Sequence, residues 1–111
     1  MEKLLRDIKC VGCEGGINPL SSERIKDLHK QIPDWEIAVD QKSLSRTFKF
    51  KGYGKTMAFV NAVAWIAHQE GHHPDMEVSF DRCTVNYTTH AINGLTDNDF
   101  ICAAKVDILL L

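Results

Sequence analysis

The sequence KTMAFVNAVAWIAHQEGHHPD, residues 55–75, predicts the longest helix of the chain, and the other expected elements lie before and after it. Residues 57–67 are all apolar except Asn61, which predicts a helix from Lys55 to about Glu70. Apolar side chains occupy nearly every side of this helix, so more than one of its faces must be covered. The sheet of so small a domain can cover one face, and we expect another face to meet a second subunit or a neighbouring helix.

The helix should end at Gly71, because glycine readily takes the left-handed cap conformation and Pro74 cannot continue the helix. Two pairs of strands are expected, one before the helix and one after it. Apolar and polar residues alternate in two segments before the helix and two after it, at residues 35–39, 44–50, 76–80 and 83–87. Turn residues separate the members of each pair, at 40–43 and at Asp81-Arg82. Each pair therefore predicts a β-hairpin.

Two further helices are expected nearer the ends of the chain. Ser21 or Ser22 caps the first of them, which runs to about Gln31 before Pro33. Thr96 caps the last helix, and an acidic residue at the third helical position gives the pattern of a capping box.

The resulting order of elements is α-β-β-α-β-β-α. Two hairpins with helices over one face predict an α+β two-layer sandwich, in which three helices cover one face of a four-stranded antiparallel sheet. We expect a single domain over residues 1–111, with residues 1–20 as an irregular leader.

Composition narrows the class of protein. The chain has 111 residues, of which 44% are hydrophobic and 25% charged, the usual values for a soluble globular domain. A net charge of −2 provides no basic field for nucleic acid. Residues 1–7 carry charges where a signal peptide would need an apolar stretch, and no run approaches the length of a membrane span. We therefore expect a cytoplasmic protein that binds neither nucleic acid nor membrane.

The four cysteines are Cys10, Cys13, Cys83 and Cys102. The Cys10-x-x-Cys13 pair could be half of a zinc site or a redox pair. No second pair of this kind follows, whereas a structural zinc site needs four ligands. Free thiols in a reducing compartment are the favoured interpretation. Cys83 and Cys102 lie on apolar faces, where cysteine usually acts as a small hydrophobic residue.

The candidate functional residues are three histidines and a carboxylate: His72, His73, His90 and Asp99. The histidine pair directly follows a helix, His90 ends the second hairpin, and Asp99 lies at a helix start, so all four can converge at one end of the sandwich. Histidine exchanges protons near neutral pH, with an unperturbed pKa of about 6.5. The cluster therefore favours proton-transfer chemistry, although each residue taken alone also has a structural explanation.

Metal binding and nucleophilic catalysis are weaker readings of the same residues. The one His-x-x-x-His pair, His68 and His72, straddles the helix end at Gly71, and adjacent histidines rarely ligate one ion together. No serine or cysteine is placed convincingly beside the histidines, and no recognised phosphate-binding glycine loop is present.

The sequence resembles the pterin-4a-carbinolamine dehydratases, also called 4a-hydroxytetrahydrobiopterin dehydratases. The residues that satisfy the family pattern, at the spacing it allows, are His68, His72, His73, Pro74, Phe80, His90 and Asp99. The resemblance extends from Ser21 onward and includes the Ile32-Pro33-Asp34-Trp35 stretch of bacterial members and the Gly94-Leu95-Thr96 entry to the last helix.

This resemblance implies a reaction and a site. The substrate would be a 4a-hydroxytetrahydropterin, which loses water to give the quinonoid dihydropterin, so recycling the cofactor of an aromatic amino acid hydroxylase. His72, His73 and His90 would surround the reacting carbon, with Asp99 and Pro74 as supporting residues. We assign proton transfer to His73 and His90 and substrate orientation to His72. Neither a metal nor an organic cofactor would be needed.

The resemblance also implies a dimer or tetramer, in agreement with the helix that is apolar all round. Met76 stands where some relatives carry an aromatic residue close to the pterin, and the leader with Cys10 and Cys13 lies outside the family pattern. Two alternative functions stay open: an interaction or dimerisation-cofactor protein, and a dehydratase acting on another pterin, such as one related to molybdopterin.

Overall fold

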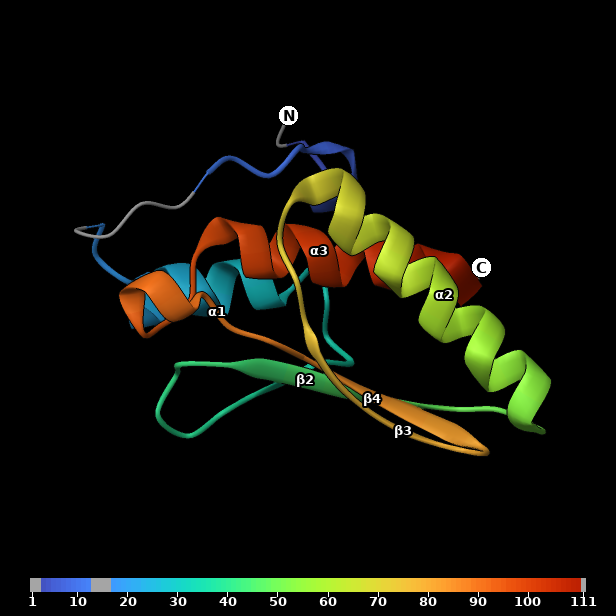
Figure 1. Ribbon diagram of the computed structural model, residues 1–111. Helices are drawn as coiled ribbons and strands as arrows, with labels where there is room; N and C mark the ends of the chain where they lie inside the picture. Colours follow the sequence, from blue (N-terminus) through green and yellow to red (C-terminus); the bar gives the residue numbers. More distant parts are fainter. Residues whose placement is uncertain (1–2, 13–16, 111) are drawn as a thin grey trace.

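The computed structural model describes residues 3–12 and 17–110 and confirms the expected fold class. Its α-helices and strands are α1 (Ser22–His29), β1 (Glu36–Ile37), β2 (Leu44–Lys49), α2 (Tyr53–Glu70), β3 (Asp75–Ser79), β4 (Arg82–Tyr87) and α3 (Asp97–Asp107). Short 3₁₀ helices occur at Leu5–Asp7, His90–Ile92 and Ile108–Leu110. The strands form one antiparallel sheet in the order β1-β2-β4-β3, and α1, α2 and α3 all lie over the same face (Figure 1).

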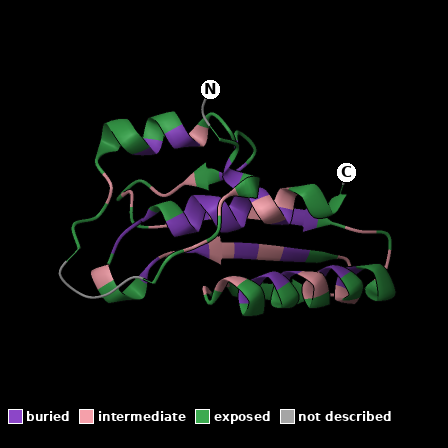
Figure 2. Ribbon diagram, turned by 90° about the horizontal axis from the view of Figure 1, so that it is seen from above, coloured by how far each residue is buried: buried purple, intermediate pink, exposed green. Residues whose placement is uncertain are grey.

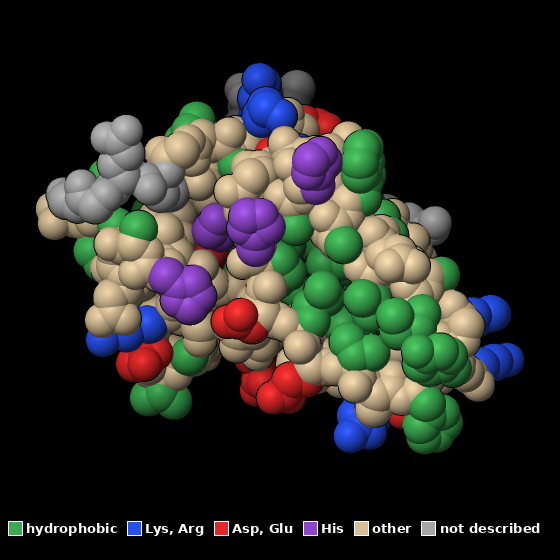
Figure 3. All heavy atoms as spheres, viewed as in Figure 1, with side chains coloured by type: hydrophobic (Ala, Val, Ile, Leu, Met, Phe, Trp, Pro, Cys, Tyr) green, Lys and Arg blue, Asp and Glu red, His purple; other side chains and the backbone are tan. Residues whose placement is uncertain are grey.

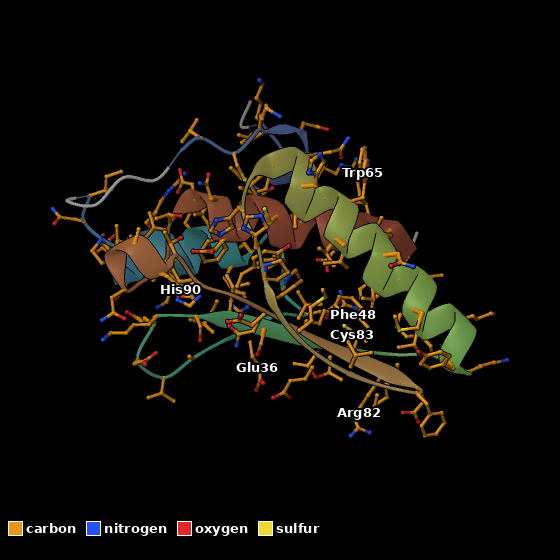
Figure 4. All side chains as sticks on the ribbon, viewed as in Figure 1. Glu36, Phe48, Trp65, Arg82, Cys83 and His90 are labelled. Carbon is orange, nitrogen blue, oxygen red and sulfur yellow. The ribbon has the colours of Figure 1, made fainter. Side chains whose placement is uncertain are left out.

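The core lies between this sheet and α3. On β4, Cys83, Val85 and Tyr87 are completely buried, as the alternating pattern predicts for the side of the sheet that faces the helices. Figure 4 shows Cys83 with Phe48 of β2 on the helix side of the sheet. Helix α3 is buried along most of its length (Figure 2), because the sheet lies below it and α1, α2 and the leader surround it.

Helix α2 presents one apolar stripe to the core and leaves other apolar residues outside. The buried stripe consists of Thr56, Phe59, Val63, Ile66 and Ala67. Trp65, on a different face, is exposed. The helix ends at Gly71 with φ of 65°, which confirms the predicted left-handed cap and turns the chain toward β3.

The predicted first strand, residues 35–39, is wrong in length. Only Glu36 and Ile37 pair with β2, and Val39 is fully exposed. A tight turn starts directly afterwards, where Gln41 has φ of 60° and donates its N–H to the oxygen of Ala38. The strand is therefore too short for alternation to set which residues are buried.

Edge position accounts for a second difference from the sequence pattern. Strand β3 forms where expected, yet Val78 is exposed because β3 is the outer strand of the sheet, and Phe80 is exposed in the turn between β3 and β4. The leader also differs, because it contains the short helix Leu5–Asp7 and buries Leu5 in the core. Across the described residues, we find no helix of the length and hydropathy that a membrane crossing requires.

Candidate functional site

A cleft of about 480 Å³ opens at the end of the sandwich where α2 ends and β3 begins. Its walls come from the end of α2, the chain around β3 and β4, the start of α3 and the leader, and they include His72, His73, Pro74, Asp75, Thr89, His90, Asn98, Val11 and Gly12. Figure 3 shows the histidine side chains gathered on this part of the surface. The structure thus brings the three predicted histidines and Pro74 to one cavity.

His72 is held by the fourth predicted residue. Its Nε2 lies 2.6 Å from Oδ1 of Asp99, and the Asp99 side chain has no exposed surface while that of His72 is 12% exposed. The αL turn at Gly71 aims His72 inward, and the first turn of α3 carries Asp99 to meet it. A histidine bonded to a buried carboxylate has a fixed ring orientation, as in the histidine–aspartate pairs of catalytic triads.

Asp99 is fixed in turn by two further donors. Its Oδ2 accepts a hydrogen bond from the Thr89 hydroxyl at 2.8 Å and one from the Thr96 backbone N–H at 3.0 Å. Thr96 and Asp99 form the predicted capping box of α3. The positive end of the α3 helix dipole also favours a negative charge here. Asp99 therefore caps the helix and orients His72 at the same time.

The ring of Tyr87 stacks against the ring of His72. The two rings are nearly parallel, at 9°, with centroids 5.8 Å apart. Burial raises the pKa of the Tyr87 hydroxyl, and the nearby Cys102, Cys10 and Asp99 groups raise it further. Tyr87 therefore stays protonated at physiological pH and acts as a fixed, uncharged platform for His72.

His73 and His90 are more open than His72. His73 is exposed at the entry to β3, next to the half-buried Pro74. His90 follows β4 in the turn that leads to α3 (Figure 4), and its side chain is 78% exposed. Its Nε2 lies 3.8 Å from Oδ2 of Asp75, so the pair is loose and solvated. These two histidines can adjust to a bound molecule, whereas His72 is preorganised.

The leader forms one wall of the cleft, which the sequence did not predict. Val11 donates its N–H to Oδ1 of Asn98 at 3.1 Å and accepts from Nδ2 of the same amide at 2.5 Å. The N–H of Cys10 donates to Oε1 of Glu70 at 2.8 Å. These contacts fix residues 10–12 against the ends of α2 and α3.

Glu70 anchors the leader with the help of a cation. Its side chain is only 7% exposed, and Lys105 lies 3.2 Å from its second oxygen. Burial alone would raise the pKa of Glu70, but the hydrogen bond from Cys10 and the Lys105 ammonium outweigh burial and lower the pKa below its ordinary value. Glu70 is therefore a carboxylate at neutral pH.

Three of the four cysteines lie within the described residues. Cys83 and Cys102 are buried and free, as expected of small hydrophobic residues. Cys10 is half-buried, and its Sγ lies 3.5 Å from Sγ of Cys102. The other half of the Cys10-x-x-Cys13 motif lies outside the described residues. Over residues 3–12 and 17–110, no three histidine, cysteine or acidic side chains are arranged to hold a metal ion.

Sequence reasoning missed Thr89, Tyr87 and the leader residues that line or support the cleft. Alternation identified Tyr87 as buried but gave no indication that it would lie against His72. Thr89 directly precedes His90. The sequence could have indicated Thr89 only through this hydroxyl beside a candidate histidine. The hydrogen bonds of Val11 and Cys10 join residues 60 or more positions apart, which local patterns cannot indicate.

Residues 18–109 match the sequence profile of the family described as pterin 4 alpha carbinolamine dehydratase. The chain belongs to this family. Among curated proteins provisionally named pterin-4-alpha-carbinolamine dehydratase, one from Nitrosomonas eutropha is 59% identical over 108 residues, covering 96% of this chain and 94% of that protein. Another, from Legionella pneumophila strain Corby, is 54% identical over 103 residues, covering 92% and 91%. The family resemblance seen in the sequence is thereby confirmed.

Two solved structures share the fold of this pterin dehydratase family member. A Brucella melitensis protein described as a transcriptional coactivator/pterin dehydratase aligns with a TM-score of 0.78 and 26% identity, over 83% of this chain and 98% of its own. A pterin dehydratase-like protein identified as a RuBisCO assembly factor in the alpha-carboxysome aligns with a TM-score of 0.60 at 23% identity, over 68% and 88%. The second likeness concerns the fold alone. Residues 1–17, which include the leader wall of the cleft, precede the part matched by the family profile.

Proposed function

We propose that this protein dehydrates 4a-hydroxytetrahydropterins to quinonoid dihydropterins by histidine acid–base catalysis. The observation that carries the proposal is the pairing of His72 with the fully buried Asp99 in a cleft that His73 and His90 also line. In the reaction, the C4a–O bond breaks, the hydroxyl leaves as water after gaining a proton, and N5 loses its proton. An acid and a base are needed, and each contributes ~100- to 10,000-fold.

His72 is suited to be the base. A carboxylate only accepts hydrogen bonds, so Nε2 of His72 carries the proton that it shares with Asp99, and Nδ1 of the neutral ring is then an acceptor. Once Nδ1 has taken the N5 proton, the Asp99 carboxylate stabilises the imidazolium. This assignment revises the sequence-based hypothesis, which gave His72 a purely orienting role.

His90 is suited to be the acid that protonates the departing hydroxyl. Its ring lies in the cleft near Asp75, and its exposure allows it to regain a proton from solvent after each turnover. His73, which is exposed and lines the same cleft, would contact the pterin and help to place it. The reaction written this way requires no metal or organic cofactor.

We further propose the cellular setting that the sequence suggests. A cytoplasmic dehydratase of this kind would recycle the pterin cofactor of an aromatic amino acid hydroxylase, which is its expected functional partner. A dehydratase acting on another pterin, such as one related to molybdopterin, would use the same residues, because the reacting ring is common to these substrates.

A homo-oligomer is part of the proposal. A groove of about 380 Å³ lies between α2 and the C-terminal turn, and its apolar lining includes Phe50, Ala58, Ala62, Leu109 and Leu110. Hydrophobic side chains also gather over the face of α2 seen in Figure 3. Exposed apolar surface of this kind is typical of contact sites, and the family resemblance supports a second copy of the chain as the occupant.

Stopped-flow absorbance tests the proposed activity. The decay of 4a-hydroxytetrahydropterin is followed with and without the protein, in the presence of a chelator. We expect chelator-resistant acceleration. Absence of acceleration by the correctly folded protein would refute the dehydratase and favour the interaction-protein alternative, to which the coactivator description of the Brucella neighbour gives some support.

A further inference from the structure

A pair of thiols next to the cleft plays no part in the proposed reaction. Sγ of Cys10 lies 3.5 Å from Sγ of Cys102, although the two residues are 92 positions apart. Cys10 is partly accessible from solvent, whereas Cys102 is completely buried in α3. A partly exposed cysteine in contact with a second, buried cysteine is the arrangement found where an oxidised cysteine is resolved by a neighbour.

We propose that Cys10 and Cys102 form an intramolecular disulfide when the protein meets hydrogen peroxide. The Cys10 thiol first loses its proton, and the thiolate attacks one peroxide oxygen. The O–O bond breaks, which gives a sulfenic acid on Cys10 and hydroxide. The hydroxide takes up the proton that the thiol released and becomes water. The sulfur of Cys102 then attacks the Cys10 sulfur. The S–O bond breaks, the S–S bond forms, and a second water leaves with the Cys102 proton. Two thiols are oxidised and one peroxide is reduced to two waters.

The surroundings of the two sulfurs fix their order of reaction. The contact with Cys10 and burial both raise the pKa of the Cys102 thiol, and the carboxylates of Glu70 and Asp99 raise it further. Cys102 is thus a protected thiol, and peroxide reaches Cys10 first. Because the sulfurs already touch, the second step needs little movement of the chain.

The disulfide would change how the wall of the cleft is held. Residues 10–12 are anchored by the hydrogen bonds from Cys10 to Glu70 and between Val11 and Asn98, all of them reversible. A covalent bond from Cys10 to α3 makes this anchoring permanent until the bond is reduced. It also closes a long loop in the unfolded chain, which stabilises the fold. The inference does not depend on the proposed dehydratase activity.

The test uses the reduced full-length chain treated with hydrogen peroxide, followed by alkylation of free thiols and peptide mapping by mass spectrometry. We expect a Cys10–Cys102 linked peptide and a higher urea midpoint for unfolding, both reversed by dithiothreitol. Cys10→Ser should abolish both effects. Cys13→Ser and Cys83→Ala should keep the linked peptide, and they control for the cysteine near Cys10 in sequence and for the other buried thiol.

Three results would overturn the proposal: a Cys10–Cys13 link in its place, a bond between two chains, or Cys10 oxidised to the sulfinic acid while Cys102 remains a free thiol. Cys102→Ser removes the second sulfur and should likewise give no linked peptide. If this variant fails to fold, the peptide map of the unaltered protein and the Cys10→Ser variant still decide between these outcomes.

Discussion

Nε2 of His72 lies 2.6 Å from Oδ1 of Asp99, in a contact that joins the end of α2 to the start of α3 across 27 residues. The contact unites a helix cap with a candidate catalytic base, because Asp99 also accepts the N–H of Thr96. The stability of α3 and the orientation of His72 therefore depend on one carboxylate. Variants of Asp99 and Thr89 can separate these two roles.

Asp99→Asn should impair turnover more than folding. Asparagine keeps the shape of the side chain and can still accept the N–H of Thr96, but it cannot stabilise a positively charged His72 ring. We expect the dehydration rate to fall by ~100-fold or more, while circular dichroism shows a folded protein. Asp97→Asn is the matched control, because Asp97 lies in the same helical turn with an exposed side chain. Equal rates for the two variants would contradict the role given to Asp99.

Thr89→Val should act through Asp99. Valine matches threonine in shape but removes the hydroxyl that donates to Oδ2 of Asp99, leaving the buried carboxylate one donor short. We expect a loss of about 1–3 kcal/mol in the free energy of unfolding, together with slower turnover and a shifted pH–rate profile. Thr89→Ser should restore the pH–rate profile.

Thr84→Val serves as the control for Thr89, because Thr84 lies on β4, the strand that precedes Thr89, with its hydroxyl bonded to Thr47. If Thr89→Val loses stability but keeps an unaltered pH–rate profile, the role of Thr89 is structural only.

The local signals in the sequence predicted most of the fold. Gly71 ends α2 and Thr96 with Asp99 starts α3 as expected, because cap chemistry depends on neighbouring residues. The alternation on β4 predicted its buried face for the same reason. Alternation predicted Val39 wrongly, because a strand of two residues at the sheet edge does not determine which side chains beyond it are buried.

The sequence predicted that the three histidines and Asp99 would lie near one another, but it did not predict the geometry of the candidate site. Spacing and family resemblance selected the histidines and Asp99, yet the depth of His72 and the openness of His90 follow from tertiary packing. The leader wall depends on contacts between Val11 and Asn98, which are distant in sequence and carry no shared motif. Periodicity indicates that a residue is buried, but it does not indicate which residue it contacts.

Glu70 should give the fold a pH dependence in the acid range. The pKa of Glu70 is lowered in the folded protein, so its contribution to stability is complete above the unfolded value of about 4.5 and is lost as the pH falls through the lower folded value. Urea unfolding of the unaltered protein and of Glu70→Gln measures this contribution. We expect a difference of about 1–3 kcal/mol near pH 7 that shrinks below about pH 4.5. A difference that grows on acidification would contradict the assigned environment of Glu70.

Charged substitutions on α2 should separate folding from assembly. Phe59 and Val63 are buried within the chain, so Phe59→Glu should unfold it. Ala62→Glu places a charge in the apolar groove near Leu109 and should lower the native mass measured by light scattering while leaving the circular dichroism spectrum unchanged. Asn61→Glu, on the exposed neighbouring position, is the control. A parent protein that is monomeric at all concentrations would refute the proposed assembly.

Dehydration of a hydroxypterin in the histidine cleft can be measured by stopped-flow absorbance of 4a-hydroxytetrahydropterin decay, with the unaltered protein and with His72→Ala and His90→Ala. We expect clear acceleration by the unaltered protein and a loss of ~100- to 10,000-fold in each variant, with folding retained. Equal acceleration by all three proteins, or none by the unaltered one, would contradict this expectation.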